Sequence, residues 1–219
     1  MTANAPFIAF EGGDGAGKGG ALVTLAAALT ADGHDVLSTR EPGGTPEGLE
    51  LRALLLAASG AVWDQGSELL LMTAARIQHV KRVIRPALAA GRVVLCDRFL
   101  GSTLAYQGGG RGIEADLILD LHRRFVEDFR PDLTVLLDVD PATGIGRSRR
   151  RLADDATDEG RFEGLDLGFH QRVRASFRAQ AAQDPYRTIL IDADRAIDVV
   201  QQDVVSHVRS RLAASLSQG

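Results

Sequence analysis

A glycine-rich segment near the start of the chain carries residues that could bind phosphate. Residues 12–18 read Gly-Gly-Asp-Gly-Ala-Gly-Lys and match the pattern G-x-x-x-x-G-K. Glycines allow backbone torsions that point successive N–H groups inward around a phosphate, and the helix that follows adds its positive end. Lys18 supplies a charge for the β- and γ-phosphates. A flexible glycine linker is disfavoured, because an apolar run at 7–10 precedes the segment and an alanine- and leucine-rich helical run at 21–29 follows it.

The two positions after Lys18 depart from this pattern. A hydroxyl residue normally follows the lysine and ligates Mg²⁺, whereas this chain has Gly19 and Gly20. Either water or another side chain completes the metal shell, or the chain binds nucleotide and transfers phosphate poorly. The loop sequence leaves both alternatives open.

Strand-like and helix-like segments alternate along the rest of the chain and must position this loop. Strands are predicted at 7–10, 35–39, 92–97, 131–138 and 188–192. Helices are predicted at 21–29, 46–58, 66–90 with a kink at Pro86, 113–128, from 141 onward, 165–182 and 196–216. This order predicts one α/β domain over residues 1–219, a doubly wound, five-stranded, mainly parallel sheet with helices on both faces. Its ligand crevice is expected at the carboxyl ends of the strands.

Composition narrows the class of protein. The chain has 219 residues, 45% of them hydrophobic, and a net charge of −4 with a pI near 5.7. This balance argues against a nucleic-acid coat or a protein that binds anionic membranes. A single cysteine, Cys96, excludes an internal disulfide, and no run of 18 apolar residues occurs, so we expect a cytoplasmic protein.

Arginine gathers at the predicted strand ends and on the helices beside them. The arginines are Arg40, Arg52, Arg76, Arg98, Arg111, Arg147, Arg149, Arg150, Arg151 and Arg161, and the carboxylates are Glu11, Asp14, Glu41, Asp97 and Asp138. A second cationic cluster beside a phosphate loop indicates a phosphorylated acceptor, which favours a nucleoside monophosphate kinase over a simple hydrolase. The charged segment 147–163 interrupts the apolar periodicity, and its charge alone favours a solvated surface loop.

Six blocks of sequence resemble bacterial thymidylate kinases along nearly the whole chain. They are FEGGDGAGK, TREPGGT, AARIQH, CDRFLGSTLAYQGGGRGI, PDLTVLLDVDP and the segment 161–174. The resemblance implies a P-loop kinase fold with a mobile lid at about 147–162. It also implies transfer of the γ-phosphate of ATP to dTMP with Mg²⁺, and a homodimer formed through the helices at 66–90.

The resemblance further implies roles for individual residues. ATP would bind Gly12, Gly13, Asp14, Gly15, Ala16, Gly17, Lys18, Gly19 and Gly20. dTMP would bind Asp14, Arg40, Glu41, Pro42, Arg52, Met72, Arg76, Arg98, Thr103, Tyr106 and Gln107. The catalytic set would be Lys18, Asp14, Arg98 and the lid arginines Arg149, Arg150 and Arg151, with Asp97 placing Mg²⁺ through water and Glu11 as a further metal candidate.

Within the acceptor set, each role is distinct. Asp14 would approach the sugar 3′-hydroxyl, Arg98 and Arg52 would hold the acceptor phosphate, and Arg76 would hydrogen-bond the thymine ring. Met72 stands where the family usually has an aromatic residue, so we expect weaker dTMP binding than an aromatic would give.

Two other functions remain open from the sequence. Gly19 and Gly20 allow a nucleotide-binding relative that is a poor catalyst. A deoxynucleoside kinase would share the phosphate loop, but its acceptor carries no phosphate and would not require Arg52 as well as Arg98.

Overall fold

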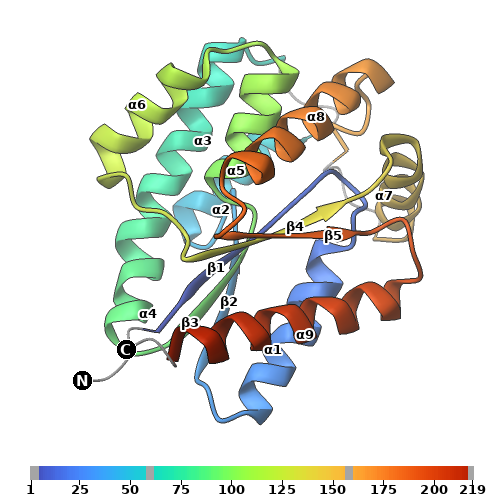
Figure 1. The fold of residues 1–219 in the computed structure, drawn as a ribbon. Coiled ribbons are helices and arrows are strands. Elements are labelled where there is room, and N and C mark those ends of the chain that lie inside the picture. Colours follow the sequence, from blue (N-terminus) through green and yellow to red (C-terminus); the bar gives the residue numbers. More distant parts are fainter. Residues whose placement is uncertain (1–4, 58–61, 156–159, 217–219) are drawn as a thin grey trace.

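The computed structural model describes residues 5–57, 62–155 and 160–216. Within these residues, one sheet lies at the centre of the molecule (Figure 1). Its strands are β1 (Phe7–Glu11), β2 (Val36–Arg40), β3 (Val93–Asp97), β4 (Leu133–Asp138) and β5 (Thr188–Asp192). They lie in the order β2-β3-β1-β4-β5 and every neighbouring pair is parallel. The predicted α/β fold with a five-stranded parallel sheet is confirmed, and β1 delivers the glycine-rich loop at the centre of the sheet's carboxyl edge.

Helices cover both faces of the sheet (Figure 1). They are α1 (Lys18–Ala31), α2 (Pro46–Leu56), α3 (Gln65–His79), η1 (Val80–Ile84), α4 (Arg85–Ala89), α5 (Leu100–Thr103), η2 (Leu104–Gly110), α6 (Ala115–Val126), α7 (Pro141–Asp155), α8 (Leu167–Gln183) and α9 (Ile197–Leu216), where η marks a π-helical segment. One face is covered by α1 and α9, and the other by α3, α4, α5, α6 and α8.

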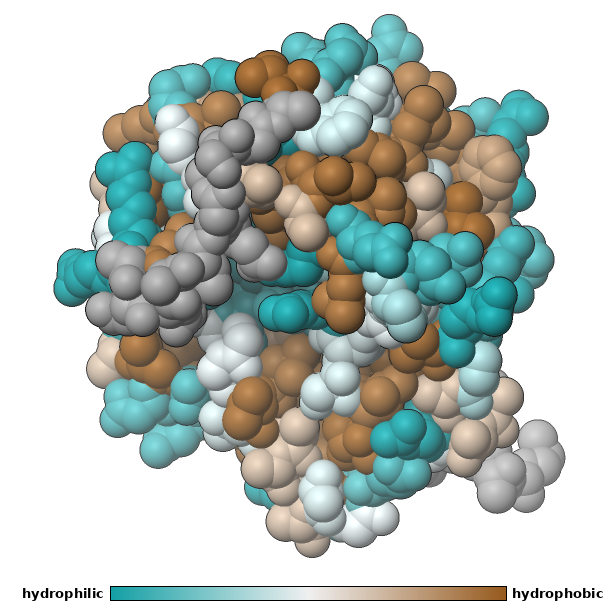
Figure 2. Space-filling view, turned by 180° about the vertical axis from the view of Figure 1, so that it is seen from behind, coloured by the Kyte–Doolittle hydropathy of each residue, from teal (hydrophilic) through white to brown (hydrophobic). Residues whose placement is uncertain are grey.

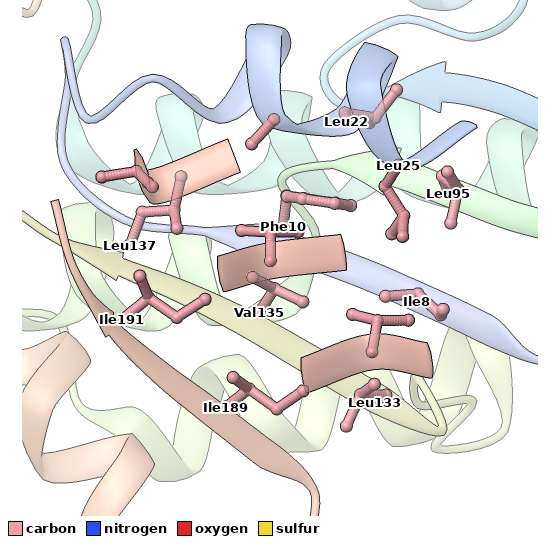
Figure 3. Close-up of a cluster of buried hydrophobic side chains, with 14 of the residues drawn as sticks. Ile8, Phe10, Leu22, Leu25, Leu95, Leu133, Val135, Leu137, Ile189 and Ile191 are labelled. Carbon is pink, nitrogen blue, oxygen red and sulfur yellow. The ribbon is translucent and has the colours of Figure 1, made fainter. Parts of the chain in front are cut away.

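Alternation along the strands divides the apolar core between the two faces. Ile8 and Phe10 of β1 point toward α1 and α9, where they pack with Leu25 and with side chains of β4 and β5 (Figure 3). Phe7 and Ala9, one position out of phase, pack in the second cluster under α3, η1 and α6. Since both faces of β1 are buried, its sequence is a continuous apolar run rather than an alternating one.

Two helical segments differ from the sequence prediction. The helix predicted over 66–90 is continuous, but its winding changes to π over η1, directly before Pro86, where a proline removes a helical N–H. The interpretation of 147–163 as an irregular loop is wrong for residues 147–155, which continue α7. No proline or glycine occurs between Arg147 and Glu159, and arginine, leucine and alanine favour helix, so charge alone was a poor guide to local structure.

The described helices include none that is both long and apolar enough to cross a membrane. The face seen in Figure 2 shows hydrophilic and hydrophobic side chains interspersed, with a hollow whose visible floor is hydrophilic.

Candidate active site

The glycine-rich loop joins β1 to α1 and takes a backbone path that side chains would block. Gly12 and Gly15 have φ angles of 135° and 70°. A Cβ at Gly12 would collide with the carbonyl oxygen of Leu137, and one at Gly15 with the carbonyl oxygen of Gly144. The close packing of this loop against β4 and α7 therefore requires glycine at both positions.

Lys18 is the first residue of α1 and lies back across the loop. Its Nζ donates to the carbonyl oxygens of Gly12 at 3.0 Å and Gly13 at 2.8 Å. Burial and then the Arg98 cation lower the pKa of Lys18, Asp97, Asp14 and Glu11 act in the opposite direction, and the net pKa is about 8. The ammonium is thus held at the phosphate loop in an environment where an anionic ligand would stabilise its charge.

Asp14, Arg98 and Tyr106 form a compact polar cluster beside the loop. Arg98 donates to Asp14 Oδ1 at 2.6 Å, and the Tyr106 hydroxyl donates to Asp14 Oδ2 at 2.8 Å. Arg98 also donates to the Gly12 carbonyl and to Ser102, and its guanidinium lies 5.0 Å from the centre of the Tyr106 ring. Burial alone would raise the pKa of Asp14, but Arg98 and then Lys18 outweigh it and hold that pKa below its usual value. Asp14 is therefore an ionised acceptor at neutral pH.

Arg76, on α3, is fixed by hydrogen bonds on several sides. Its Nε donates to Glu41 at 2.8 Å, and its NH2 donates to the Thr103 hydroxyl at 2.8 Å and to the Phe99 carbonyl at 3.1 Å. The other Glu41 oxygen lies 3.0 Å from Nδ1 of His79, a side chain with no exposed surface. Glu41 thus binds both Arg76 and His79, and this buried network sets the plane of the Arg76 guanidinium.

One cavity of about 650 Å³ brings these groups together at the carboxyl edge of the sheet. All eleven residues predicted to bind dTMP line it: Asp14, Arg40, Glu41, Pro42, Arg52, Met72, Arg76, Arg98, Thr103, Tyr106 and Gln107. Gly15, Gly17, Lys18, Gly19, Gly20, Asp97 and Arg151 line it as well. The predicted acceptor residues and most of the predicted phosphate-loop residues therefore share one continuous space.

Several predicted residues lie outside the lining of this cavity. Gly12, Gly13 and Ala16 of the loop do not line it, and Gly12 and Gly13 instead border a separate small void of about 20 Å³. Among the three predicted lid arginines, Arg151 lines the cavity, whereas Arg149 donates to the Glu163 carbonyl and Arg150 is exposed elsewhere on α7.

The carboxylates at the strand ends differ in their freedom to bind a metal. Glu11 accepts hydrogen bonds from the Ser102 hydroxyl at 2.5 Å and the Phe99 N–H at 3.0 Å, and burial raises its pKa. Asp138, at the end of β4, is occupied by Arg174 and Arg178.

Asp97, at the end of β3, differs from these carboxylates. Its Oδ1 is buried and has no hydrogen-bond partner among the described residues. Unpaired buried carboxylate oxygens are costly, so this atom fits a role as an acceptor for a metal ion or its bound water. Over the described ranges, no group of three or more His, Cys, Asp and Glu residues gathers into a metal cage, so a cation here would depend on ligands from phosphate and water. A Cβ at Gly19 would meet no atom within 4 Å, so space beside Lys18 is open.

Sequence reasoning missed two buried residues that hold this site together, Glu68 and His79. Both lie on α3 with no exposed surface, Glu68 in its first turn and His79 at its last residue. Together with Met72 and Arg76 they recur at helical spacing on the face of α3 that is turned into the protein. Polar residues in this stripe were the signal that could have identified them.

Comparison with known proteins gives one consistent family. Residues 10–204 match the family model described as thymidylate kinase. A thymidylate kinase from Cereibacter sphaeroides is 58% identical over 201 residues, covering 92% of this chain and 93% of that protein. One from Magnetococcus marinus is 48% identical over 209 residues, covering 95% and 98%. The crystal structure of thymidylate kinase from Ehrlichia chaffeensis superposes with a TM-score of 0.75 at 34% identity, covering 94% of this chain and 99% of that one. With this geometry and these likenesses, the chain belongs to the thymidylate kinase family.

Proposed function

We propose that the chain phosphorylates dTMP with ATP to give dTDP and ADP, using the cavity between the phosphate loop and Arg76. The observation that carries this proposal is that all eleven predicted acceptor residues line one cavity with Lys18. Two cationic regions, one around Lys18 and one around Arg98 and Arg52, suit a reaction between two phosphorylated substrates. A nucleotide-binding relative without catalysis or a kinase for unphosphorylated nucleosides is less well supported, because neither explains both regions.

The acceptor end of the cavity has the groups that thymine and deoxyribose require. The fixed guanidinium of Arg76 donates to the thymine ring, and Met72 covers one face of it. Asp14 accepts from the sugar 3′-hydroxyl, and the Tyr106 ring limits the space near the 2′ position. Arg98 and Arg52 bind the phosphate of dTMP, and this contact turns one phosphate oxygen toward the phosphate loop.

The donor end positions the triphosphate. Backbone N–H groups of residues 13–18 and the start of α1 bind the β-phosphate. Lys18 gives up its hydrogen bonds to the Gly12 and Gly13 carbonyls and donates to phosphate oxygens instead. A phosphate oxygen of dTMP attacks the γ-phosphorus in line, the bond to the β-phosphate oxygen breaks, and ADP leaves. Arg151, the predicted lid arginine that lines the cavity, offsets charge on the transferred group.

Asp97 would hold Mg²⁺ through water in this mechanism. When bound, Mg²⁺ neutralises charge on the β- and γ-phosphates. The donor set fits, because Mg²⁺ commonly combines one or two carboxylates with phosphate and water ligands, and Asp97 Oδ1 is a buried carboxylate oxygen with no partner in the part of the chain that the structure describes.

The same proposal includes a homodimer of single-domain subunits. The apolar clusters on the two faces pack against one sheet, which suits one domain over 1–219. On the outer faces of α3 and α6, Leu70, Leu117 and Phe125 are 57%, 49% and 49% exposed. A second copy packed on these helices would bury that apolar surface. The acidic balance of the chain supports neither nucleic acid nor anionic membrane as a partner.

An ATP-dependent assay with dTMP, thymidine and dUMP across a Mg²⁺ titration tests the proposal. We expect dTDP formation that is lost in Lys18→Ala, while thymidine is not phosphorylated. Lys81→Ala is the matched control, because Lys81 is the only other lysine in the sequence and is exposed on η1. Tight binding of ATP and dTMP without turnover would instead indicate a nucleotide-binding relative.

A further inference from the structure

Glu68 pairs with side chains from two other segments at the acceptor end of the cavity, residues 107–111 and Arg161. This side chain, in the first turn of α3, has no exposed surface. Its Oε1 accepts from Gln107 Nε2 at 2.9 Å, and its Oε2 accepts from Arg111 NH2 at 3.1 Å and lies 2.8 Å from Arg161 NH2. One buried carboxylate thus connects α3, η2 and the segment that precedes α8.

The Arg161 contact extends this connection to α2. Arg161 NH1 donates to the Leu55 carbonyl at 3.0 Å, and its backbone N–H donates to the Leu56 carbonyl at 3.3 Å. These are the last two residues of α2, the helix that also carries Arg52 into the cavity. Arg52, one of the two proposed phosphate contacts, therefore lies on a helix whose last turn is bound by Arg161, and Arg161 is paired with Glu68.

Phe162 extends these contacts to Tyr106, the residue proposed to limit the space beside the sugar. The Arg111 and Arg161 guanidiniums lie 5.9 Å and 5.5 Å from the centre of its ring. Phe162 in turn packs edge-on against Tyr106, with ring centres 5.4 Å apart and planes at 85°. Tyr106 is the residue that donates to Asp14. Contacts therefore run without a break from Glu68 through the arginines and Phe162 to the cluster beside the phosphate loop.

We infer that Glu68 is a positioning residue for dTMP, an assignment that rests on the proposed function. It makes no contact with the substrate and does not line the cavity. It acts by holding Gln107, Arg161 and Phe162 so that the acceptor walls lie at the spacing that dTMP requires. Gln107 can turn its amide only with the loss of its bond to Glu68, so the carboxylate also fixes the donor and acceptor pattern that Gln107 presents.

Stability alone is a weak explanation for this arrangement. Burying charged groups costs solvation energy that ion pairs often fail to recover, and apolar side chains of similar volume commonly pack as stably. A carboxylate that connects α3 to two other segments instead specifies geometry. The loss of Glu68 should therefore affect dTMP binding more than ATP binding, which occurs at the other end of the cavity.

Glu68→Gln tests this role in the full chain, with dTMP binding measured by calorimetry and steady-state kinetics measured for both substrates. We expect the dissociation constant and KM for dTMP to rise about tenfold, with KM for ATP changed by less than about twofold. Glu127→Gln is the matched control, because Glu127 also pairs with an arginine, Arg85, but on the surface at 73% exposure. That control should leave both Michaelis constants unchanged.

A second variant separates positioning from folding. Glu68→Gln leaves two partly buried guanidiniums, those of Arg111 and Arg161, without this counter-charge and should lower stability. Glu68→Gln combined with Arg161→Met leaves the net charge of the Glu68, Arg111 and Arg161 group at +1, as in the natural chain, because one cation and one anion are removed together. We expect this double variant to recover thermal stability while dTMP binding stays about tenfold weaker.

Three outcomes decide the matter. If dTMP binding returns with stability in the double variant, Glu68 is only structural and the inference is wrong. Equal dTMP binding by Glu68→Gln and the natural chain would also overturn it. If the natural chain itself binds no dTMP, the proposed function and the inference both fail, and ATP binding alone would remain.

Discussion

The Arg98 guanidinium lies 2.6 Å from a carboxylate oxygen of Asp14, although the two residues are 84 positions apart. Asp14 belongs to the phosphate loop and Arg98 follows β3, so the parallel pairing of β1 with β3 brings them together. Arg98 has a φ of 70°, an unfavourable angle for a residue with a side chain, which fits a position held for function. The pair keeps Asp14 ionised and aims Arg98 into the cavity, so each residue prepares the other for its proposed substrate contact.

Asp14→Asn should weaken dTMP binding about 10- to 100-fold, because a hydrogen bond to a charged group contributes about 1.5–3 kcal/mol. A dTMP analogue without the 3′-hydroxyl provides the control. If Asp14 accepts from that hydroxyl, the analogue binds the natural protein more weakly than dTMP does, whereas Asp14→Asn binds both alike. An equal penalty for the analogue in both proteins would show that Asp14 acts on some other group.

The low pKa of Asp14 also has a consequence for stability. Its folded pKa lies below its ordinary value of 3.8, so the ionised form stabilises the fold above that pH. This stabilisation is lost as the pH falls from 3.8 through the folded pKa. The difference in unfolding free energy between the natural chain and Asp14→Asn should therefore narrow in acid.

The lowered pKa of Lys18 predicts that ATP binding depends on pH. Its pKa is lowered to about 8 in the ligand-free protein, chiefly by burial, so its positive charge is lost above that pH. We expect kcat/KM for ATP to fall above about pH 8, while kcat at saturating ATP stays level because bound phosphates retain the proton. A constant kcat/KM for ATP up to about pH 9.5 would show that Lys18 remains charged without ligand.

The charge of Lys18 costs stability, whereas the charge of Asp14 adds to it, although stability rises with pH for both residues because both folded pKa values are lowered. The folded pKa of Lys18 lies below its ordinary value of 10.5, so burying the charged form costs stability below about pH 8. That cost is relieved as the pH rises from about 8 to 10.5. Comparison with Lys18→Met isolates this contribution from other groups that titrate in the same range.

Gly19 allows a direct test of the missing hydroxyl. Gly19→Ser and Gly19→Ala both add a Cβ into open space, and both should favour α1 by up to about 1 kcal/mol. Only serine adds a possible metal ligand. We expect Gly19→Ser to need several-fold less Mg²⁺ for half-maximal turnover than Gly19→Ala. The same Mg²⁺ dependence in both variants would show that water or Asp97 already completes the metal shell.

Much of this site could be predicted from sequence because its residues follow the ends of parallel strands. The loop after β1, the last residue of β2 (Arg40), and Asp97 at the end of β3 with Arg98 directly after it must meet at one edge of the parallel sheet, however the helices pack. Glu68 and His79 could not be placed in this way. Their partners, Gln107 and Arg161 for Glu68 and Glu41 for His79, come from segments 38 to 93 residues distant, and only tertiary packing brings them together.

Replacement of Met72 by an aromatic residue should strengthen dTMP binding. Its side chain lines the cavity but lacks the ring that would stack on thymine. Met72→Phe should lower KM for dTMP about 2- to 10-fold, matching the 0.5–1.5 kcal/mol of an aromatic pair. Met72→Leu, which adds no ring, is the control and should bring no gain. If KM is unchanged or higher in Met72→Phe, thymine does not lie against this position.

Replacement of His79 should weaken dTMP binding, although its side chain does not line the cavity. Its Nε2 lies 2.7 Å from the Thr39 hydroxyl and its Nδ1 lies 3.0 Å from Glu41, so it fixes the carboxylate that holds Arg76. In His79→Leu, Glu41 loses this partner and Arg76 is oriented less well. We expect KM for dTMP to rise about 3- to 10-fold at nearly unchanged kcat, as for a loss of about 1 kcal/mol of uniform binding.

His122→Leu is the control that distinguishes positioning by His79 from a general loss of packing. His122 is also buried, at 2% exposure, and lies 2.7 Å from the Phe129 carbonyl, but it does not line the cavity. His79→Leu loses two hydrogen bonds and His122→Leu loses one, so both should lower the free energy of unfolding by about 1–3 kcal/mol, with the larger loss in His79→Leu. Only His79→Leu should change KM for dTMP. If the two variants affected that constant equally, the effect would come from lower stability, and the orientation of Arg76 would not depend on His79.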